Sequence, residues 1–197
     1  MKLFHTPTSP FVRKVMVVAK EIGVPLETTF LRPTPVQADP VLSKENPLNK
    51  IPVLITPEGP LYDSAVICEY LDRENKVIPA SGAARFRVLR LQALCDGILE
   101  AGVIVFYEKT TRPPDKQYAP WLDGQTQKMN QALDALELEC ESFSEKADHS
   151  QICAGVTIGW LEFRKPIGDV RANRAKLFRW YDAFRQRPSM KDTEPHA

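Results

Sequence analysis

The hydrophobic pattern of the first 75 residues alternates between strand-like and helix-like segments. Between residues 10 and 22, apolar side chains recur at steps of three and four, which places them on one face of a helix. Ser9 is a natural N-cap for this helix, Pro10 suits its first turn, and Gly23 suits its end. Shorter apolar runs between turn residues predict the remaining elements. The expected elements are strands over 2–5, 27–31, 53–55 and 61–62, and helices over 10–22, 41–45 and 64–75.

The rest of the chain has only helical periodicity. It predicts four helices, over 85–110, 121–144, 150–165 and 173–187. Prolines mark several of their ends, and the last helix is expected to stop at Pro188 because proline breaks a helix. The final residues of the chain are expected to fray.

Proline content divides the chain into two parts. Eleven of the 17 prolines precede residue 80, so short elements with frequent turns are confined to the first part. The change in composition over 76–83 is typical of a linker. We therefore predict an α/β domain over residues 1–76 and an all-helical domain over residues 84–197.

Composition and charge narrow the class of protein. The net charge is +1 and the basic residues are dispersed, which argues against a nucleic-acid partner. No apolar stretch approaches the ~18 residues of a membrane span, and the polar start argues against a signal peptide, so we expect a cytoplasmic protein. The cysteines show no metal-binding or redox spacing and are expected to be buried small hydrophobes, with no metal site. They are Cys68, Cys95, Cys140 and Cys153.

Three segments resemble the landmarks of glutathione S-transferases, in that family's order and at its spacing. They are residues 9–14 (SPFVRK), 46–54 (NPLNKIPVL) and 62–71 (YDSAVICEYL). Residues 91–97 and 159–164 are also similar to small bacterial members. The resemblance covers nearly the whole chain and implies a thioredoxin-like βαβαββα domain followed by a helical bundle. It further implies a glutathione site in the first domain and a pocket for a second substrate between the two.

Ser9 is the residue that the resemblance places at the glutathione sulfur. A free thiol has a pKa near ~8.5, and lowering it by ~2 units requires about 2.7 kcal/mol of preference for the anion. A hydrogen bond to a charged group supplies about 1.5–3 kcal/mol and a helix N-terminus about 0.3–1 kcal/mol. One hydroxyl at this position is therefore sufficient in magnitude. Capping the helix is the structural alternative for Ser9, and Thr8 is the alternative hydroxyl.

The resemblance implies two further contact regions for glutathione. Pro52 is cis in the family, and the backbone of Ile51 and Val53 would pair with the cysteinyl part of glutathione. Ser64 would hold the γ-glutamyl carboxylate at a helix N-terminus and Asp63 its ammonium group, although Ser64 can also be read as an ordinary helix cap. Lys50 is a candidate to face the glycine carboxylate, with a solvated loop lysine as the alternative. Phe11 is a candidate to shape the cleft, with a core phenylalanine as the alternative.

The helical half offers candidates for the pocket of a small, apolar electrophile. They are Phe106, Tyr107, Arg112 and Trp160, each of which can equally belong to the core. Since position 9 is serine and cannot form a mixed disulfide, conjugation is favoured over disulfide exchange. A non-catalytic member that binds glutathione, another ligand or a protein partner stays open, as does glutathione-dependent reduction of peroxides or disulfides. The family also implies a homodimer, with its seam along 64–75 and the start of the long helix at 85–87.

One segment departs from the family pattern. Relatives begin the penultimate long helix with Ser or Thr followed three residues later by Asp, and we align this pair with Ser150 and Cys153. Because a thiol cannot accept a backbone N–H as a carboxylate does, a loss of about 1 kcal/mol is expected there, recoverable in Cys153→Asp.

Overall fold

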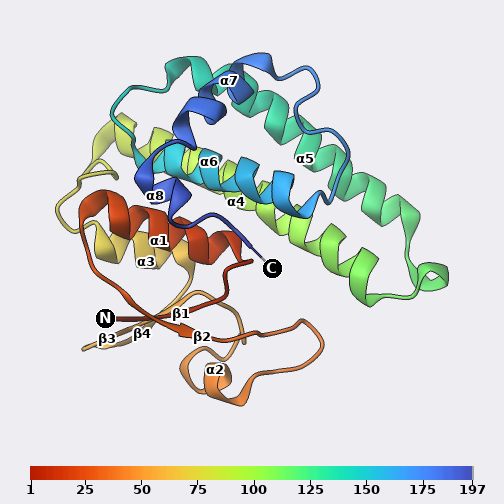
Figure 1. The fold of residues 1–197 in the computed structure, drawn as a ribbon, viewed down its shortest axis with the longest axis horizontal. Coiled ribbons are helices and arrows are strands. Elements are labelled where there is room, and N and C mark those ends of the chain that lie inside the picture. Colours follow the sequence, from red (N-terminus) through yellow and green to blue (C-terminus); the bar gives the residue numbers. More distant parts are fainter. Residues whose placement is uncertain (197) are drawn as a thin grey trace. The chain divides into compact units, whose positions relative to one another are not determined.

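The computed structural model describes residues 1–196 and consists of two units (Figure 1). Of the described residues, one unit contains 1–80 together with 188–196, and the other contains 81–187. The division drawn from the sequence placed residues 84–197 in the helical domain. Its C-terminal end is corrected, because the short helix α8 (Pro188–Lys191) packs against α1 (Pro10–Ile22) in the first unit. The break expected at Pro188 is followed not by fraying but by helix α8, and Thr193 just beyond it is buried.

A four-stranded sheet forms the centre of the first unit, in the order β2-β1-β3-β4. Its strands are β1 (Lys2–His5), β2 (Glu27–Phe30), β3 (Val53–Thr56) and β4 (Gly59–Leu61). β1 is parallel to β2 and antiparallel to β3, and β3 is antiparallel to β4. This arrangement, followed by a helical unit, confirms the thioredoxin-like fold class expected from the sequence.

Side chains alternate along each strand and therefore point to both faces of the sheet, and both faces are covered. Phe4 pairs with Val53, and these two side chains cluster with Leu42 of the short helix α2 (Pro40–Glu45). Helices α1 and α3 (Ser64–Leu71) contact each other and lie on the side of the sheet opposite α2 (Figure 1).

Helix α3 ends four residues before its expected end. Asp72 is 4% exposed, and its carboxylate accepts the backbone N–H groups of Lys76, Val77 and Ile78 at 2.8, 3.0 and 2.7 Å. These bonds turn the chain away from the helix axis. On α3 itself the buried face contains Cys68, whereas Val66 is 48% exposed.

The second unit is helical, as expected. Its α-helices are α4 (Gly82–Thr111), α5 (Ala119–Glu139), α6 (His149–Arg164) and α7 (Ala175–Phe184), with short 3-10 turns η1 (Pro114–Lys116) and η2 (Cys140–Ser142). Helix α4 contacts both α5 and α6. All residues from 149 to 161 of α6 are buried, as in a helix that is surrounded by others. None of the helices in residues 1–196 has both the length and the apolar composition of a membrane span.

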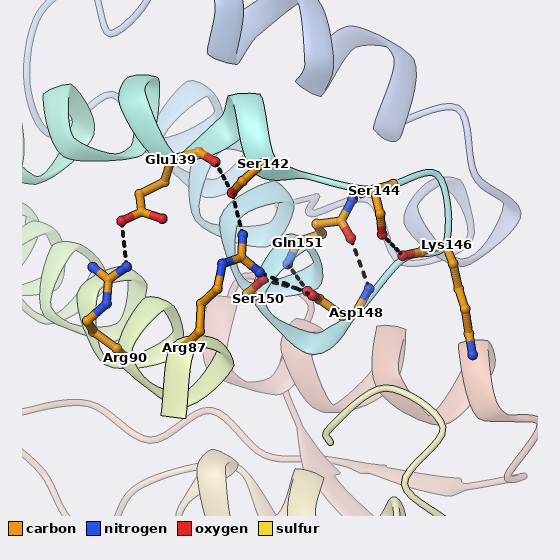
Figure 2. A network of polar contacts seen from close by, with 9 residues as sticks. All are labelled: Arg87, Arg90, Glu139, Ser142, Ser144, Lys146, Asp148, Ser150 and Gln151. Carbon is orange, nitrogen blue, oxygen red and sulfur yellow. Dashed lines mark hydrogen bonds and ion pairs between the residues drawn. The ribbon is translucent and has the colours of Figure 1, made fainter. Parts of the chain in front are cut away.

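The start of α6 corrects the expected capping defect (Figure 2). Asp148, not Ser150, is the N-cap: its Oδ1 accepts the Gln151 backbone N–H at 3.1 Å, and the Gln151 side chain accepts the Asp148 N–H at 3.0 Å. This is a complete reciprocal capping box. Ser150 instead donates its hydroxyl to Asp148 at 2.5 Å, and Arg87 of α4 approaches the same carboxylate at 3.8 Å. The sequence alignment of the cap was therefore displaced by two residues, and Cys153 lies outside it.

Gly102 permits the close approach of α4 to α6. A Cβ atom at this position would lie 2.6 Å from Cζ3 of Trp160, a side chain that is 2% exposed and has little room to move. We expect Gly102→Ala to lower the free energy of unfolding by about 1–3 kcal/mol, measured by urea denaturation.

Gly97→Ala is the matched control on the same helix. A Cβ there meets nothing within 4 Å, so alanine is expected to stabilise by about 0.5–1 kcal/mol through its helix propensity. Equal effects of the two substitutions would contradict the tight contact at Gly102.

Candidate functional site at one edge of the sheet

The three landmark segments meet at one edge of the sheet. Helix α1 begins just after the carboxyl end of β1, and α3 begins just after the carboxyl end of β4. The register pairs Phe4 with Val53 and Leu54 with Leu61, so β3 starts at the same edge at which β1 and β4 end. Ser9, the Ile51–Pro52 segment and Asp63 therefore belong to one edge, although 54 residues separate the first from the last.

Ser9 caps α1 and retains a free donor capacity. Its Oγ accepts the backbone N–H of Val12 at 3.3 Å, which is the structural role anticipated for it. A serine hydroxyl accepts through its lone pairs and donates through its O–H, so capping leaves the proton available to a ligand. The side chain is half-buried, and the first turn of α1 has no acidic residue to offset the positive end of the helix. The arrangement suits an anion.

The side chains beside Ser9 have other contacts. Thr8 Oγ1 lies 3.5 Å from Thr6 Oγ1. The ring of Phe11 is half-buried, and the Lys14 ammonium lies 5.8 Å from its centroid. His5, at the end of β1, was not noticed in the sequence; burial lowers its pKa, so its imidazole is mostly neutral at pH 7.

The loop before β3 is held by two asparagines whose roles the sequence did not reveal. Asn46 is 2% exposed, donates from Nδ2 to the Lys50 carbonyl at 2.8 Å, and accepts the Leu48 N–H at 3.0 Å. Asn49 has a positive φ of 52° and accepts the Asp39 N–H at 2.9 Å. The signal was present, since asparagine favours left-handed backbone and local hydrogen bonds.

Ile51 and Lys50 are thereby brought to the edge of the sheet. The Ile51–Pro52 peptide bond is cis, as the resemblance implied. Strand β3 begins at Val53, so Ile51 precedes the strand itself, while its side chain packs on the cluster of Phe4 and Val53. Lys50 is exposed.

Asp63 and Ser64 form the start of α3. Asp63 is the N-cap, with Oδ1 accepting the Ala65 N–H at 2.9 Å, so the reading of Ser64 as the cap is corrected. Ser64 is the first helical residue and is 3% exposed. Asp63 is exposed, and a carboxylate that accepts one backbone N–H can accept further donors.

The four pocket candidates of the helical unit have different surroundings. Phe106 and Tyr107 are half-buried and in edge contact, with ring centroids 5.4 Å apart. The guanidinium of Arg164, which was not among the candidates, lies 4.6 Å from the Phe106 centroid. Arg112 is exposed and paired with Glu108 at 2.9 Å, and Trp160 is in the interior.

All four cysteines are buried, as expected, and none of them is in a disulfide bond. Burial raises the pKa of the Cys140 thiol, with the nearby carboxylates Glu137 and Glu141 adding to the effect. Within residues 1–196, no group of three or more His, Cys, Asp or Glu side chains could hold a metal ion.

Known proteins are similar to this chain in sequence and in fold. A profile of the glutathione S-transferase N-terminal domain matches residues 3–76. An uncharacterized GST-like protein of Escherichia coli K12, YibF, is 34% identical over 99% of this chain and 98% of its own length. The chain belongs to the glutathione S-transferase family.

Two solved structures of this family are close to the chain over its full length. A glutathione transferase family member from Pseudomonas fluorescens Pf-5 with bound glutathione is 42% identical, with a TM-score of 0.93 and coverage of 100% of this chain and 99% of that one. A second structure from the same source holds S-(propanoic acid)-glutathione and is 41% identical, with a TM-score of 0.88 and coverage of 99% of each chain. In this member of the glutathione S-transferase family, the three landmark segments lie at one edge of the thioredoxin-like sheet.

Proposed function

We propose that this chain is a glutathione transferase in which Ser9 donates a hydrogen bond to the sulfur of bound glutathione and stabilises its thiolate. The observation that carries the proposal is the convergence of Ser9, the Ile51–Pro52 segment and the start of α3 at one sheet edge. The 42% identical relative that holds glutathione supports the choice of ligand.

Glutathione has the polarity that this edge can match. Its γ-glutamyl end has a carboxylate and an ammonium group, which suit the N-terminus of α3 at Ser64 and the carboxylate of Asp63. The backbone of Ile51 and Val53 suits its cysteinyl part, with Phe11 and Pro52 beside it and Lys50 near the glycine carboxylate. The sulfur then lies at the N-terminus of α1, where Ser9 and the helix favour the anion.

The reaction that we propose is conjugation with a small apolar electrophile. Serine cannot form a mixed disulfide, and the relative that holds S-(propanoic acid)-glutathione shows that a family member accommodates glutathione substituted at sulfur. Phe106, Tyr107, Arg112 and Trp160 stay the candidates for the electrophile's surroundings, with the two half-buried rings favoured by their exposure. We also propose a cytoplasmic homodimer, in keeping with exposed apolar side chains at Val66 of α3 and Phe86 of α4.

A specific observation favours a second candidate, a protein that binds glutathione without activating it. The Ser9 Oγ already accepts the Val12 N–H, so capping alone accounts for a serine at this position. The two candidates differ in one measurable quantity, which is the pKa of the thiol in the bound state.

Ultraviolet absorbance of the thiolate against pH, with saturating protein, measures that pKa. We expect the bound thiol to titrate about 2 units below free glutathione, and Ser9→Ala to remove most of the shift. Ser9→Gly separates the two roles of the side chain, since glycine loses the hydroxyl but caps nearly as well. Thr8→Val tests the alternative hydroxyl.

Three outcomes distinguish the candidates. A lowered pKa that both Ser9 variants abolish supports conjugation through Ser9. An unshifted thiol in a bound complex favours the non-catalytic candidate, and loss of the shift only in Thr8→Val transfers the role to Thr8. A coupled assay with glutathione reductase then separates conjugation from the reduction of peroxides or disulfides.

A further inference from the structure

The C-terminal segment, residues 188–193, lies along α1, the helix that Ser9 caps. Helix α8 packs against α1, and Asp192 and Thr193, which follow α8, continue the contact. The segment therefore belongs to the candidate glutathione-binding unit, although more than 100 residues of the helical unit separate it in sequence from the rest of that unit.

Arg13 is the centre of this contact. Its side chain is 5% exposed, and its Nη2 donates to the carbonyl of Met190 at 3.0 Å. Nε lies 3.5 Å from the Thr193 hydroxyl, which itself donates to the Ser189 carbonyl at 2.8 Å. A planar guanidinium thus joins two successive turns of the C-terminal segment in one fixed geometry.

Two further contacts hold the last turn of α1 to the same segment. Ser189, which is 5% exposed, donates its hydroxyl to the Glu21 carboxylate. Lys20 and Asp192 form an exposed ion pair at 2.9 Å, which is expected to contribute little. The segment therefore contacts α1 from its second turn to its end.

The first turn of α1 couples Arg13 to Ser9. The Arg13 backbone N–H donates to the Ser9 carbonyl at 3.0 Å, and the Val12 N–H holds the Ser9 hydroxyl oxygen at 3.3 Å. A shift or loosening at Arg13 is transmitted directly to the serine by these two bonds. Hydrogen bonds to a sulfur anion depend on such placement, since a misplacement of the order of 1 Å costs much of their effect.

We propose that the C-terminal segment stabilises α1 through its contacts and that Arg13 is a positioning residue for Ser9. The consequence at the thiol rests on the proposed function, whereas the consequence for the helix does not. Deprived of the Arg13 contact, the chain is expected to keep its fold but to hold the first turn of α1 less firmly.

Full-length Arg13→Met and Thr193→Val test whether the C-terminal segment stabilises α1. Thr193→Ser is the rescue variant that keeps the hydroxyl. Lys191→Met is the matched control, because Lys191 is an exposed residue of α8 itself. The first readout is hydrogen exchange of the Val12 and Arg13 amides in the protein without glutathione. The second is the pKa of the bound glutathione thiol.

In Arg13→Met we expect the protection of these two amides to fall by about tenfold or more, and the thiol pKa to rise by about one unit. Thr193→Val should change both in the same direction and Thr193→Ser should restore them, with amides in the helical unit unchanged. Unaltered exchange in both Arg13→Met and Thr193→Val would overturn the proposal that the C-terminal segment stabilises α1. If the wild-type protein does not lower the thiol pKa at all, the proposed function fails. Hydrogen exchange still decides whether the C-terminal segment stabilises α1.

Discussion

Cys153→Asp is expected to destabilise the protein by about 3–5 kcal/mol near neutral pH, because it puts a carboxylate into the interior of the helical unit. Cys153 is 2% exposed, and it lies in the stretch of α6 whose residues are all buried. Its Sγ is 3.5 Å from Nε2 of His149, which is also within 3.0 Å of Gln92 Oε1. A charge introduced here loses its hydration with little room to regain it. For a chain of this length the thermal midpoint should fall by roughly 6–20 °C.

Cys153→Ser provides the control for the volume and polarity of the site. Its hydroxyl is nearly isosteric with the thiol, so we expect a loss of less than about 1.5 kcal/mol. Gln151→Ala tests the capping box itself and should cost about 1 kcal/mol, since it leaves the Asp148 N–H without its side-chain acceptor. A higher midpoint for Cys153→Asp would restore the sequence interpretation, in which position 153 belongs to the cap.

Elements bounded by local signals could be predicted from the sequence. Helix α1 has the expected bounds, Pro10 to Ile22, because Ser9 and Gly23 act on the backbone of adjacent turns. The convergence of the three landmarks was likewise implicit in the βαβαββα order, which determines the edge at which each helix starts.

Features that depend on distant partners could not be predicted. The hydrophobic period of α1 gave no reason to expect Arg13 in the interior, since its partners lie 177 and 180 residues away. At α6, both Asp148 and Ser150 are good N-caps, and only the reciprocal bond with Gln151 decides between them. Periodicity also cannot separate a pocket ring from a core ring, so Phe106 and Trp160 looked alike in sequence although only Trp160 is in the interior.

Asp72→Ala is expected to lower the free energy of unfolding by about 3 kcal/mol. Its carboxylate accepts three backbone N–H groups, and two of these belong to Val77 and Ile78, which are 7% and 2% exposed. Removing the acceptor leaves these two donors buried without a partner, at a cost of about 1–3 kcal/mol each. The Lys76 residue is exposed, so its N–H can turn to water.

Glu74→Ala is the control two residues away. Glu74 is 76% exposed and pairs with Lys76 at 2.9 Å, so its removal should change stability by no more than about 0.5 kcal/mol. Urea denaturation of both variants gives the comparison, and hydrogen exchange at Val77 and Ile78 locates the effect. Because the Asp72 bonds end α3 and fix the course of residues 76–78, we expect protection at these two amides to fall in Asp72→Ala well before the sheet opens. Equal stability of the two variants would mean that the segment after α3 is held by the burial of Val77 and Ile78 alone.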